Sequence, residues 1–150
     1  MSANLESASP VGLLLSDDLL FSSRVTATAR ELGLTIKTVR SAEALEGLAR
    51  QQTPRCVILD LANPGLSLPE LIGRLRAICA PMPRVVAYGS HVDAAGLRAA
   101  REAGCAIVWP RSKFVEELPR ALPEWFAGES SSTPGAEPQA ARTVGPGDAV

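Results

Sequence analysis

The chain has 150 residues, of which 46% are hydrophobic and 21% charged, and its formal net charge at pH 7 is −1. This length fits one domain with a substantial apolar core, and the composition excludes a chain that is disordered throughout or a fibrous repeat. A protein that binds nucleic acid by neutralising phosphates needs an excess of clustered lysine and arginine, which this charge balance does not provide. We therefore expect no nucleic-acid partner.

The N-terminus and the cysteines indicate the compartment. The first ten residues, MSANLESASP, have neither the basic start nor the apolar centre of a signal peptide, and no later apolar run reaches membrane-spanning length. Cys56, Cys79 and Cys105 lie far apart beside apolar residues, which is typical of buried thiols in a reducing compartment. His91, the single histidine, is interpreted as a loop residue, and without a CxxC pair no zinc site is expected. The sequence predicts a cytoplasmic protein with no membrane partner.

Composition divides the chain into three parts. We expect a flexible N-terminus over residues 1–9, a folded domain over residues 10–126 and a disordered tail, rich in Gly, Pro and Ser, over residues 127–150. The tail has no aromatic residue and few large aliphatic ones, so it cannot bury enough apolar surface to offset the entropy lost on ordering. It is also too short and too polar to hold an output domain, so we expect a stand-alone domain.

Five short apolar runs predict five strands, in chain order Val11–Leu15, Thr35–Val39, Cys56–Leu59, Val85–Tyr88 and Ala106–Trp109. Three of the five are continuously apolar, which is typical of strands buried on both faces of a parallel sheet. Between the runs, apolar residues recur at helical spacing, first at Phe21, Val25, Ala29 and Leu32, and later at Leu68, Leu71, Ile72, Leu75 and Ile78. Alternating strands and helices predict an α/β fold with a doubly wound parallel sheet and helices on both faces.

Helix boundary signals agree with this division. The segment SLPE, from Ser67 to Glu70, has the pattern of a capping box with a proline in the first turn. Asp93 is placed to cap an alanine-rich helix that ends at Gly104, and Gly33 ends the first helix in the same way.

The last segment is less regular. Pro119 and Pro123 predict that no continuous helix runs from Lys113 to Phe126, because each proline removes a hydrogen bond and crowds the preceding turn. We expect a short turn there, followed by a helix that restarts near Pro119.

In a parallel sheet of this kind, ligands bind outside the carboxyl ends of the strands, near the point where strand order reverses. If the first and third strands are neighbours, Asp17 or Asp18 lies close to Asp60. Carboxylates that share a crevice repel one another unless a cation neutralises them, and one or two carboxylates with waters suit Mg²⁺. Other polar or small residues at predicted strand ends are Ser16, Arg40, Ser41, Gly89, Ser90, His91, Pro110, Arg111 and Ser112.

Three segments resemble parts of response-regulator receiver domains. LLSDDLLFSSRVTATARELG resembles the opening of these domains, where acidic residues follow the first strand and a helix runs on to a glycine. VILDLANPGLSLPELIGRLR is similar to their phosphoacceptor segment, with Pro64 four residues after Asp60, and AAREAGC resembles the end of their fourth helix. The resemblance covers about Val11 to Leu122, and it implies a flavodoxin-like sheet with strand order 2-1-3-4-5.

The resemblance also implies roles for individual residues. Asp60 matches the phosphoacceptor, which takes a phosphoryl group from a histidine kinase or phosphotransfer protein and thereby switches binding of a downstream signalling protein. Asp17 matches the direct Mg²⁺ ligand, and its usual acidic neighbour falls on Ser16 unless the pair is Asp17 and Asp18. The backbone carbonyl of Ala62 would be the third protein ligand of the metal.

Two positions depart from the receiver pattern. Receivers place Thr or Ser after the fourth strand, where this chain has Gly89, with Ser90 one residue later. They place lysine after the fifth strand, where this chain has Arg111, whose planar guanidinium can fork onto a phosphate but is not a point charge. Gly89, Ser90 and Arg111 are the candidates for contacting the phosphoryl group and for switching.

Other interpretations stay open. The departures at Gly89 and Arg111 favour a pseudo-receiver that binds a partner without being phosphorylated. Asp60 alone could be a structural acceptor, and Asp17 and Asp18 could be charges favoured at a helix N-terminus. A haloacid-dehalogenase-like phosphohydrolase needs an acidic residue two positions after its nucleophile, where this chain has Ala62, so we expect no enzyme of that class.

Overall fold

The structure of the protein is a computed structural model that describes residues 10–127. The predicted flexible N-terminus (1–9) and the predicted tail from residue 128 onward lie outside the described residues, whereas Ala127, predicted as the first residue of the tail, is the last residue of a helix. Five strands alternate with five helices, in the order β1 (Val11–Leu15), α2 (Leu19–Glu31), β2 (Thr35–Val39), α3 (Ala42–Gln52), β3 (Cys56–Asp60), α4 (Leu68–Ile78), β4 (Arg84–Gly89), α5 (Ala94–Ala103), β5 (Ile107–Pro110) and α6 (Arg111–Ala127). All strand pairs are parallel, and the sheet has the order β2-β1-β3-β4-β5. The predicted fold class and strand order are confirmed.

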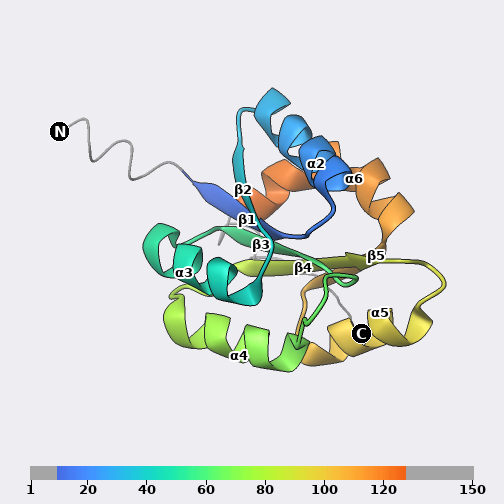
Figure 1. The fold of residues 1–150 in the computed structure, drawn as a ribbon. Coiled ribbons are helices and arrows are strands. Elements are labelled where there is room, and N and C mark those ends of the chain that lie inside the picture. The colour runs from blue at the N-terminus through green and yellow to red at the C-terminus, as the bar shows by residue number, and fades with distance from the viewer. Residues whose placement is uncertain (1–9, 128–150) are drawn as a thin grey trace, which may run out of the picture.

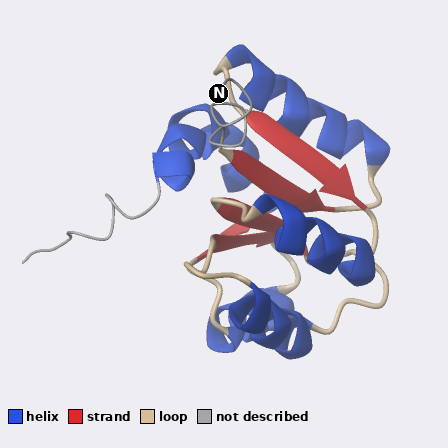
Figure 2. Ribbon diagram, turned by 90° about the vertical axis from the view of Figure 1, so that its left-hand side faces the viewer, coloured by secondary structure: helices blue, strands red, loops and turns tan. Residues whose placement is uncertain are grey.

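The sheet lies between two layers of helices (Figures 1 and 2), with α2 and α6 on one face and α3, α4 and α5 on the other. Side chains alternate between the two faces along each strand. In β3, Val57 and Leu59 join the core under α3, α4 and α5, whereas Cys56 and Ile58 join the core under α2 and α6. By the same alternation, Asp60 projects toward the α2 and α6 side of the sheet.

The first two predicted strands match β1 and β2, while β3 extends one residue further to include Asp60. The predicted apolar stripe of the first helix is buried at Phe21, Val25 and Ala29. Leu32 was predicted on the same stripe but is 40% exposed, because it is the C-cap residue of α2 and lies beyond the last helical turn.

Three of the predicted helix boundaries are confirmed. The Asp93 side chain accepts a hydrogen bond from the Gly96 amide at 3.0 Å and so caps α5. Gly33 and Gly104 follow their helices with φ of 77° and 112°, in the left-handed region that glycine adopts most easily.

The predicted capping box at Ser67 is wrong. Ser67 is the N-cap residue of α4, but its side chain makes no capping hydrogen bond within the described residues. Pro69 has no amide hydrogen, which removes one of the two donors that a cap residue normally meets. Glu70 does not reach back to Ser67 either, since its carboxylate lies 3.9 Å from the Arg74 guanidinium in the next turn.

The predicted break in the last segment is also wrong, because α6 is one continuous helix over 17 residues. Pro119 and Pro123 are both on its exposed face, so their rings do not disturb the packing against the sheet. A proline inside a helix costs about 3 kcal/mol, whereas each large apolar side chain that becomes buried contributes about 1.5–3 kcal/mol. The buried face offsets the two prolines, and its residues are Phe114, Leu118, Ala121, Leu122, Trp125 and Phe126.

No helix within residues 10–127 combines the length and the apolar character needed to cross a membrane.

Candidate functional site

Asp60 ends the central strand β3 and is buried, with 2% of its surface exposed. Its Oδ2 accepts a hydrogen bond from the Ser16 hydroxyl at 2.7 Å, and its Oδ1 accepts one from the Ala62 amide at 2.9 Å. The turn that follows is fixed by backbone bonds, from the Leu61 amide to the Tyr88 carbonyl and from the Asn63 amide to the Asp60 carbonyl. Each oxygen of this buried carboxylate therefore has a protein donor, and the group is held in one orientation.

Among the residues after β1, Ser16 is the one whose side chain donates a hydrogen bond to Asp60. The Ser16 hydroxyl also accepts a hydrogen bond from the Asp18 amide at 3.1 Å. Asp18 caps α2, since its Oδ1 accepts from the Phe21 amide at 3.0 Å. Asp17 is exposed to solvent. Of the two predicted metal ligands after β1, Asp18 is thus engaged with the helix and Asp17 faces solvent.

Arg111 is the first residue of α6 and faces the same edge of the sheet. Its Nη1 lies 3.5 Å from Asp18 Oδ2, in an ion pair whose two side chains are 40% and 38% exposed. Its guanidinium also lies over two aromatic rings, 4.7 Å from the centroid of Phe21 and 5.7 Å from that of Tyr88. An exposed ion pair contributes at most about 1 kcal/mol, so the aromatic contacts help to hold Arg111 in place.

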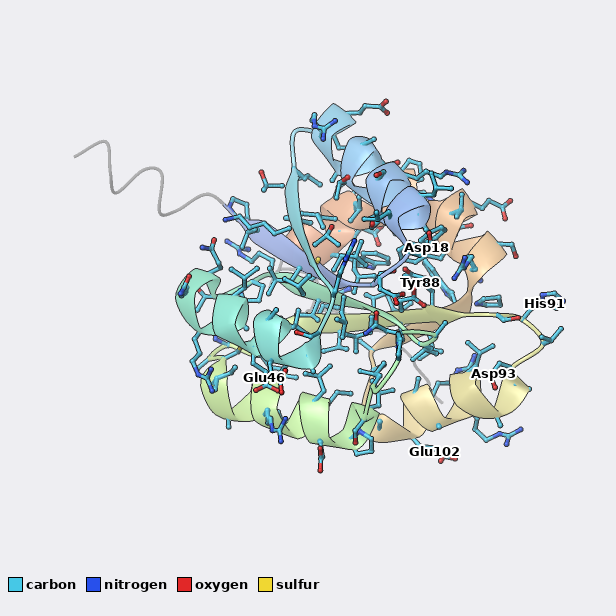
Figure 3. The ribbon with its side chains drawn as sticks, viewed as in Figure 1. Asp18, Glu46, Tyr88, His91, Asp93 and Glu102 are labelled. Atoms are coloured by element: carbon cyan, nitrogen blue, oxygen red, sulfur yellow. The ribbon has the colours of Figure 1, made fainter. Side chains whose placement is uncertain are left out.

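Tyr88 is a part of the site that the sequence did not reveal. It pairs with Asp60 in the β3–β4 register and is fully buried, with ring centroids 4.9 Å from Phe21 and 4.6 Å from Phe114. Its hydroxyl lies near Ser16 and Asp60 but has no hydrogen-bond partner within residues 10–127. Burial is the largest cause that raises the pKa of Tyr88 above its ordinary value, and the Asp60 charge adds to the rise. Tyr88 and Asp18, both labelled in Figure 3, each contact the guanidinium of Arg111.

Strand register is the signal that identifies Tyr88. Residues that are partners in neighbouring parallel strands project to the same face of a sheet. Once β3 and β4 are aligned, a residue at the end of β4 must lie beside Asp60. The apolar pattern of β4 alone does not reveal this, because Tyr88 reads as one more buried strand residue.

Gly89 leaves space that another side chain fills. A β-carbon at Gly89 would lie 3.2 Å from Leu61 Cδ1 and 3.3 Å from Leu61 Cβ, which is tighter than ordinary van der Waals contact. Leu61 therefore occupies the region into which a threonine or serine at this position would project. Ser90 is exposed, and its Oγ accepts from the Val92 amide at 3.3 Å, as a turn residue does.

A basic pocket of about 740 Å³ opens between α2, α6 and the loop after β4. Its walls include cationic, hydroxyl and apolar side chains, and the residues that line it are Phe21, Arg24, Ala62, Ser90, His91, Arg111, Ser112 and Val115. Figure 3 shows His91 in the loop between β4 and α5, well outward from Tyr88. The pocket adjoins the phosphoacceptor candidate through Ala62, whose amide binds Asp60.

The residues present suit Mg²⁺ in their chemistry. The Asp60 and Asp17 carboxylates and the Ala62 carbonyl are oxygen donors, and Mg²⁺ commonly takes one or two carboxylates and keeps several waters. Within residues 10–127, however, no three His, Cys, Asp or Glu side chains converge on one point. Each Asp60 oxygen accepts a hydrogen bond, and a carboxylate oxygen has a second lone pair with which it could bind an ion.

Solved structures of response-regulator receiver domains match the chain along most of its length. The receiver domain of the response regulator NarL from Mycobacterium tuberculosis has 19% sequence identity and a TM-score of 0.65, over 81% of this chain and 98% of that one. A response regulator from Chloroflexus aurantiacus has 20% identity and a TM-score of 0.68, over 79% and 98%.

A third similar structure is the receiver domain of Ssk1 from Saccharomyces cerevisiae, crystallised with the histidine phosphotransfer signalling protein Ypd1. It has 15% identity and a TM-score of 0.67, over 79% of this chain and 90% of that one. The sequence itself matches no protein-family model and no curated protein. At these identities the shared property is the fold, so the chain has the receiver-domain fold.

Proposed function

We propose that the protein is a receiver-type signalling module that accepts a phosphoryl group on Asp60 from a histidine kinase or phosphotransfer protein. The observation that carries this proposal is the Asp60 carboxylate, held by Ser16 and Ala62 at the end of the central strand of a 2-1-3-4-5 sheet. In such sheets the carboxyl ends of the strands form the reactive edge. The co-crystallised Ssk1 receiver supports a phosphotransfer protein as the kind of partner.

The chemistry follows from a carboxylate nucleophile. An Asp60 oxygen attacks the phosphorus of a phosphohistidine, an O–P bond forms, and the P–N bond breaks as the imidazole leaves and takes up a proton. The Ala62 amide keeps its bond to Oδ1, whereas Oδ2 is released from Ser16 as the attacking oxygen. Because Asp60 is 2% exposed, the surrounding side chains must move before a donor reaches it, and we expect the reaction to be slow.

In this proposal Asp60, Asp17 and the Ala62 carbonyl would hold Mg²⁺. When bound, the ion would neutralise and position the oxygens of the incoming phosphoryl group. Asp18 serves instead as the cap of α2 and the partner of Arg111.

Phosphorylation would change the partners of Arg111. A phosphoryl group adds about −1.5 to −2 charge at pH 7 and would compete with Asp18 for the guanidinium, whose ion pair is partly exposed. A shift of Arg111 would alter its contacts with Phe21 and Tyr88 and so change the surface around β4 and α6. We propose that a downstream signalling protein recognises this change, and that the chain is not an enzyme.

A second candidate function is a receiver fold that binds its partner without phosphorylation. Three contacts favour it: the Ser16 hydroxyl on Asp60, the Leu61 side chain against Gly89, and the Arg111 pair with Asp18. Together they occupy the positions from which a phosphoryl group would be bound.

Mass spectrometry of the intact protein separates the two functions. The wild type is incubated with Mg²⁺ and a small phosphodonor such as phosphoramidate, beside Asp60→Asn and the control Asp93→Asn. A single phosphoryl adduct on the wild type and on Asp93→Asn, absent from Asp60→Asn, supports phosphorylation of Asp60. An unmodified wild type would overturn the first proposal and favour the second, and an adduct that persists in Asp60→Asn would also contradict it.

A further inference from the structure

The basic pocket concentrates positive charge in a protein that is not basic overall. The chain has a formal net charge of −1, yet none of the residues that line the pocket within the described part of the chain is acidic. Arg24 comes from α2 and Arg111 from α6, so two arginines from separate helices line one space. Two guanidiniums suit a phosphate, because each can donate two parallel hydrogen bonds to its oxygens.

Other pocket residues carry side chains that can donate hydrogen bonds. Ser90, His91 and Ser112 line the same space. Arg111 and Ser112 also form the start of α6, a 17-residue helix with no acidic residue in its first turn. The positive end of this helix is therefore not offset by its own side chains and favours an anion in the pocket.

Within residues 10–127, Asp18 is the carboxylate that forms an ion pair with an arginine of the pocket. It lies 3.5 Å from Arg111, and both side chains are more than a third exposed. Solvent screens such a pair, so an anion that reaches Arg111 together with Arg24 can replace Asp18. The Arg111 guanidinium carbon lies 4.7 Å from the centroid of the Phe21 ring. This ring contact preorganises the guanidinium for binding an anion.

The size of the pocket indicates more than an inorganic ion. Its volume of about 740 Å³ lies in the range of small-molecule sites. Phe21 and Val115 give it apolar walls beside the cationic ones. A ligand that matches both features has a phosphate at one end and a compact organic body at the other.

We propose that this pocket binds a small phosphate monoester noncovalently, with its phosphate between Arg24 and Arg111 and its organic part against Val115. This binding requires neither Mg²⁺ nor a reaction at Asp60. By displacing Asp18 from Arg111, the ligand would act on the contact that joins the start of α2 to the Tyr88 ring near the end of β4. The receiver fold would then respond to a metabolite as well as to, or in place of, phosphorylation.

Isothermal titration calorimetry with the full chain tests this proposal. The Asp60→Asn protein, which cannot form the aspartyl phosphate, is titrated in EDTA with phenyl phosphate, ribose 5-phosphate, inorganic phosphate and uncharged ribose. We expect saturable binding of at least one monoester, at least tenfold tighter than inorganic phosphate, and none of ribose. Adding Arg24→Ala should weaken that binding at least tenfold, whereas Arg30→Ala, at an exposed position of the same helix outside the pocket, should not change it.

Three outcomes would overturn the proposal: no saturable binding of either monoester, equal affinity in the Arg24→Ala protein, or inorganic phosphate binding as tightly as the monoesters. Arg24 is exposed, so its replacement should leave the thermal unfolding temperature unchanged and the comparison interpretable. Since Asp60 is already replaced, the result is independent of whether the wild type is phosphorylated.

Discussion

The Ser16 hydroxyl and the Asp60 carboxylate, at the ends of the neighbouring strands β1 and β3, form a hydrogen bond of 2.7 Å between two buried side chains. The bond gives Asp60 Oδ2 a neutral donor from the residue that the resemblance to receivers aligns with a second acidic side chain. Asp60 is thereby stabilised without a cation. Both the stability of the fold and its response to Mg²⁺ should therefore depend on residue 16.

Replacing Ser16 with alanine should destabilise the protein. The substitution removes the donor to Asp60 Oδ2 and the acceptor of the Asp18 amide, and it leaves a buried charged oxygen short of a partner. Such a loss typically costs about 1–3 kcal/mol. Urea denaturation of Ser16→Ala beside Ser23→Ala, an exposed serine on α2, measures the difference. A free energy of unfolding equal in the two variants would show that the bond contributes nothing.

Replacing Ser16 with aspartate should make stability depend on Mg²⁺. Two carboxylates in hydrogen-bond range repel each other and raise their pKa values unless a cation lies between them. We expect Ser16→Asp to unfold at a lower temperature than the wild type in EDTA and to regain stability when Mg²⁺ is added. Ser16→Asn, of similar size but uncharged, is the control. An equal Mg²⁺-induced shift in both variants would contradict a metal bound between residues 16 and 60.

The folded framework could be predicted from the sequence because its signals are local. The apolar run of β3 and the capping residues Asp93 and Gly104 act within a few residues of their own position, so the pattern along the chain contains them. The continuous helix α6 could not be predicted in this way. The gain that offsets Pro119 and Pro123 comes from contacts with the distant sheet, which the helix sequence alone does not specify.

The same distinction between local signals and distant contacts applies to the candidate site. The position of Asp60 at the end of a buried strand follows from the sequence, because strand ends define the edge of a parallel sheet. The side-chain contacts do not follow, since the bond from Ser16 and the neighbour Tyr88 depend on strand register and side-chain orientation. The sequence also shows two acidic residues after β1, Asp17 and Asp18. It does not show that the Asp18 side chain caps α2.

Replacing Gly89 with threonine should strain the structure, because the new side chain would crowd Leu61. A β-carbon there would lie 3.2 Å from Leu61 Cδ1, and Gly89 itself is buried, so the leucine must move. Overpacking of this kind costs about 1–3 kcal/mol. Shortening the leucine should relieve the strain, so Gly89→Thr should cost less stability in a Leu61→Ala background than in the wild type. A double-mutant cycle by urea denaturation measures this coupling, and additive effects of the two changes would contradict the contact.

Alkaline pH should destabilise the protein through its buried weak acids. Burial raises the pKa of the Cys56 thiol from its ordinary value of 9.0 to about 12, and the pKa of Tyr88 shifts in the same direction. The unfolded chain therefore loses these protons before the folded protein does. The corresponding stability is fully present below about pH 9 and is lost as the pH rises toward 12.

Urea denaturation at several pH values measures this loss. One group whose folded pKa is raised contributes a slope of about 1.4 kcal/mol per pH unit in this window, so Cys56 alone should account for roughly 2–3 kcal/mol by about pH 11. Cys56→Ala is the control, since it cannot ionise at this position while Tyr88 is retained. Comparing slopes rather than absolute stabilities removes the effect of the smaller side chain on packing. If the wild type and Cys56→Ala lost stability equally between about pH 9 and about pH 11, the buried thiol would not be a source of the alkaline sensitivity.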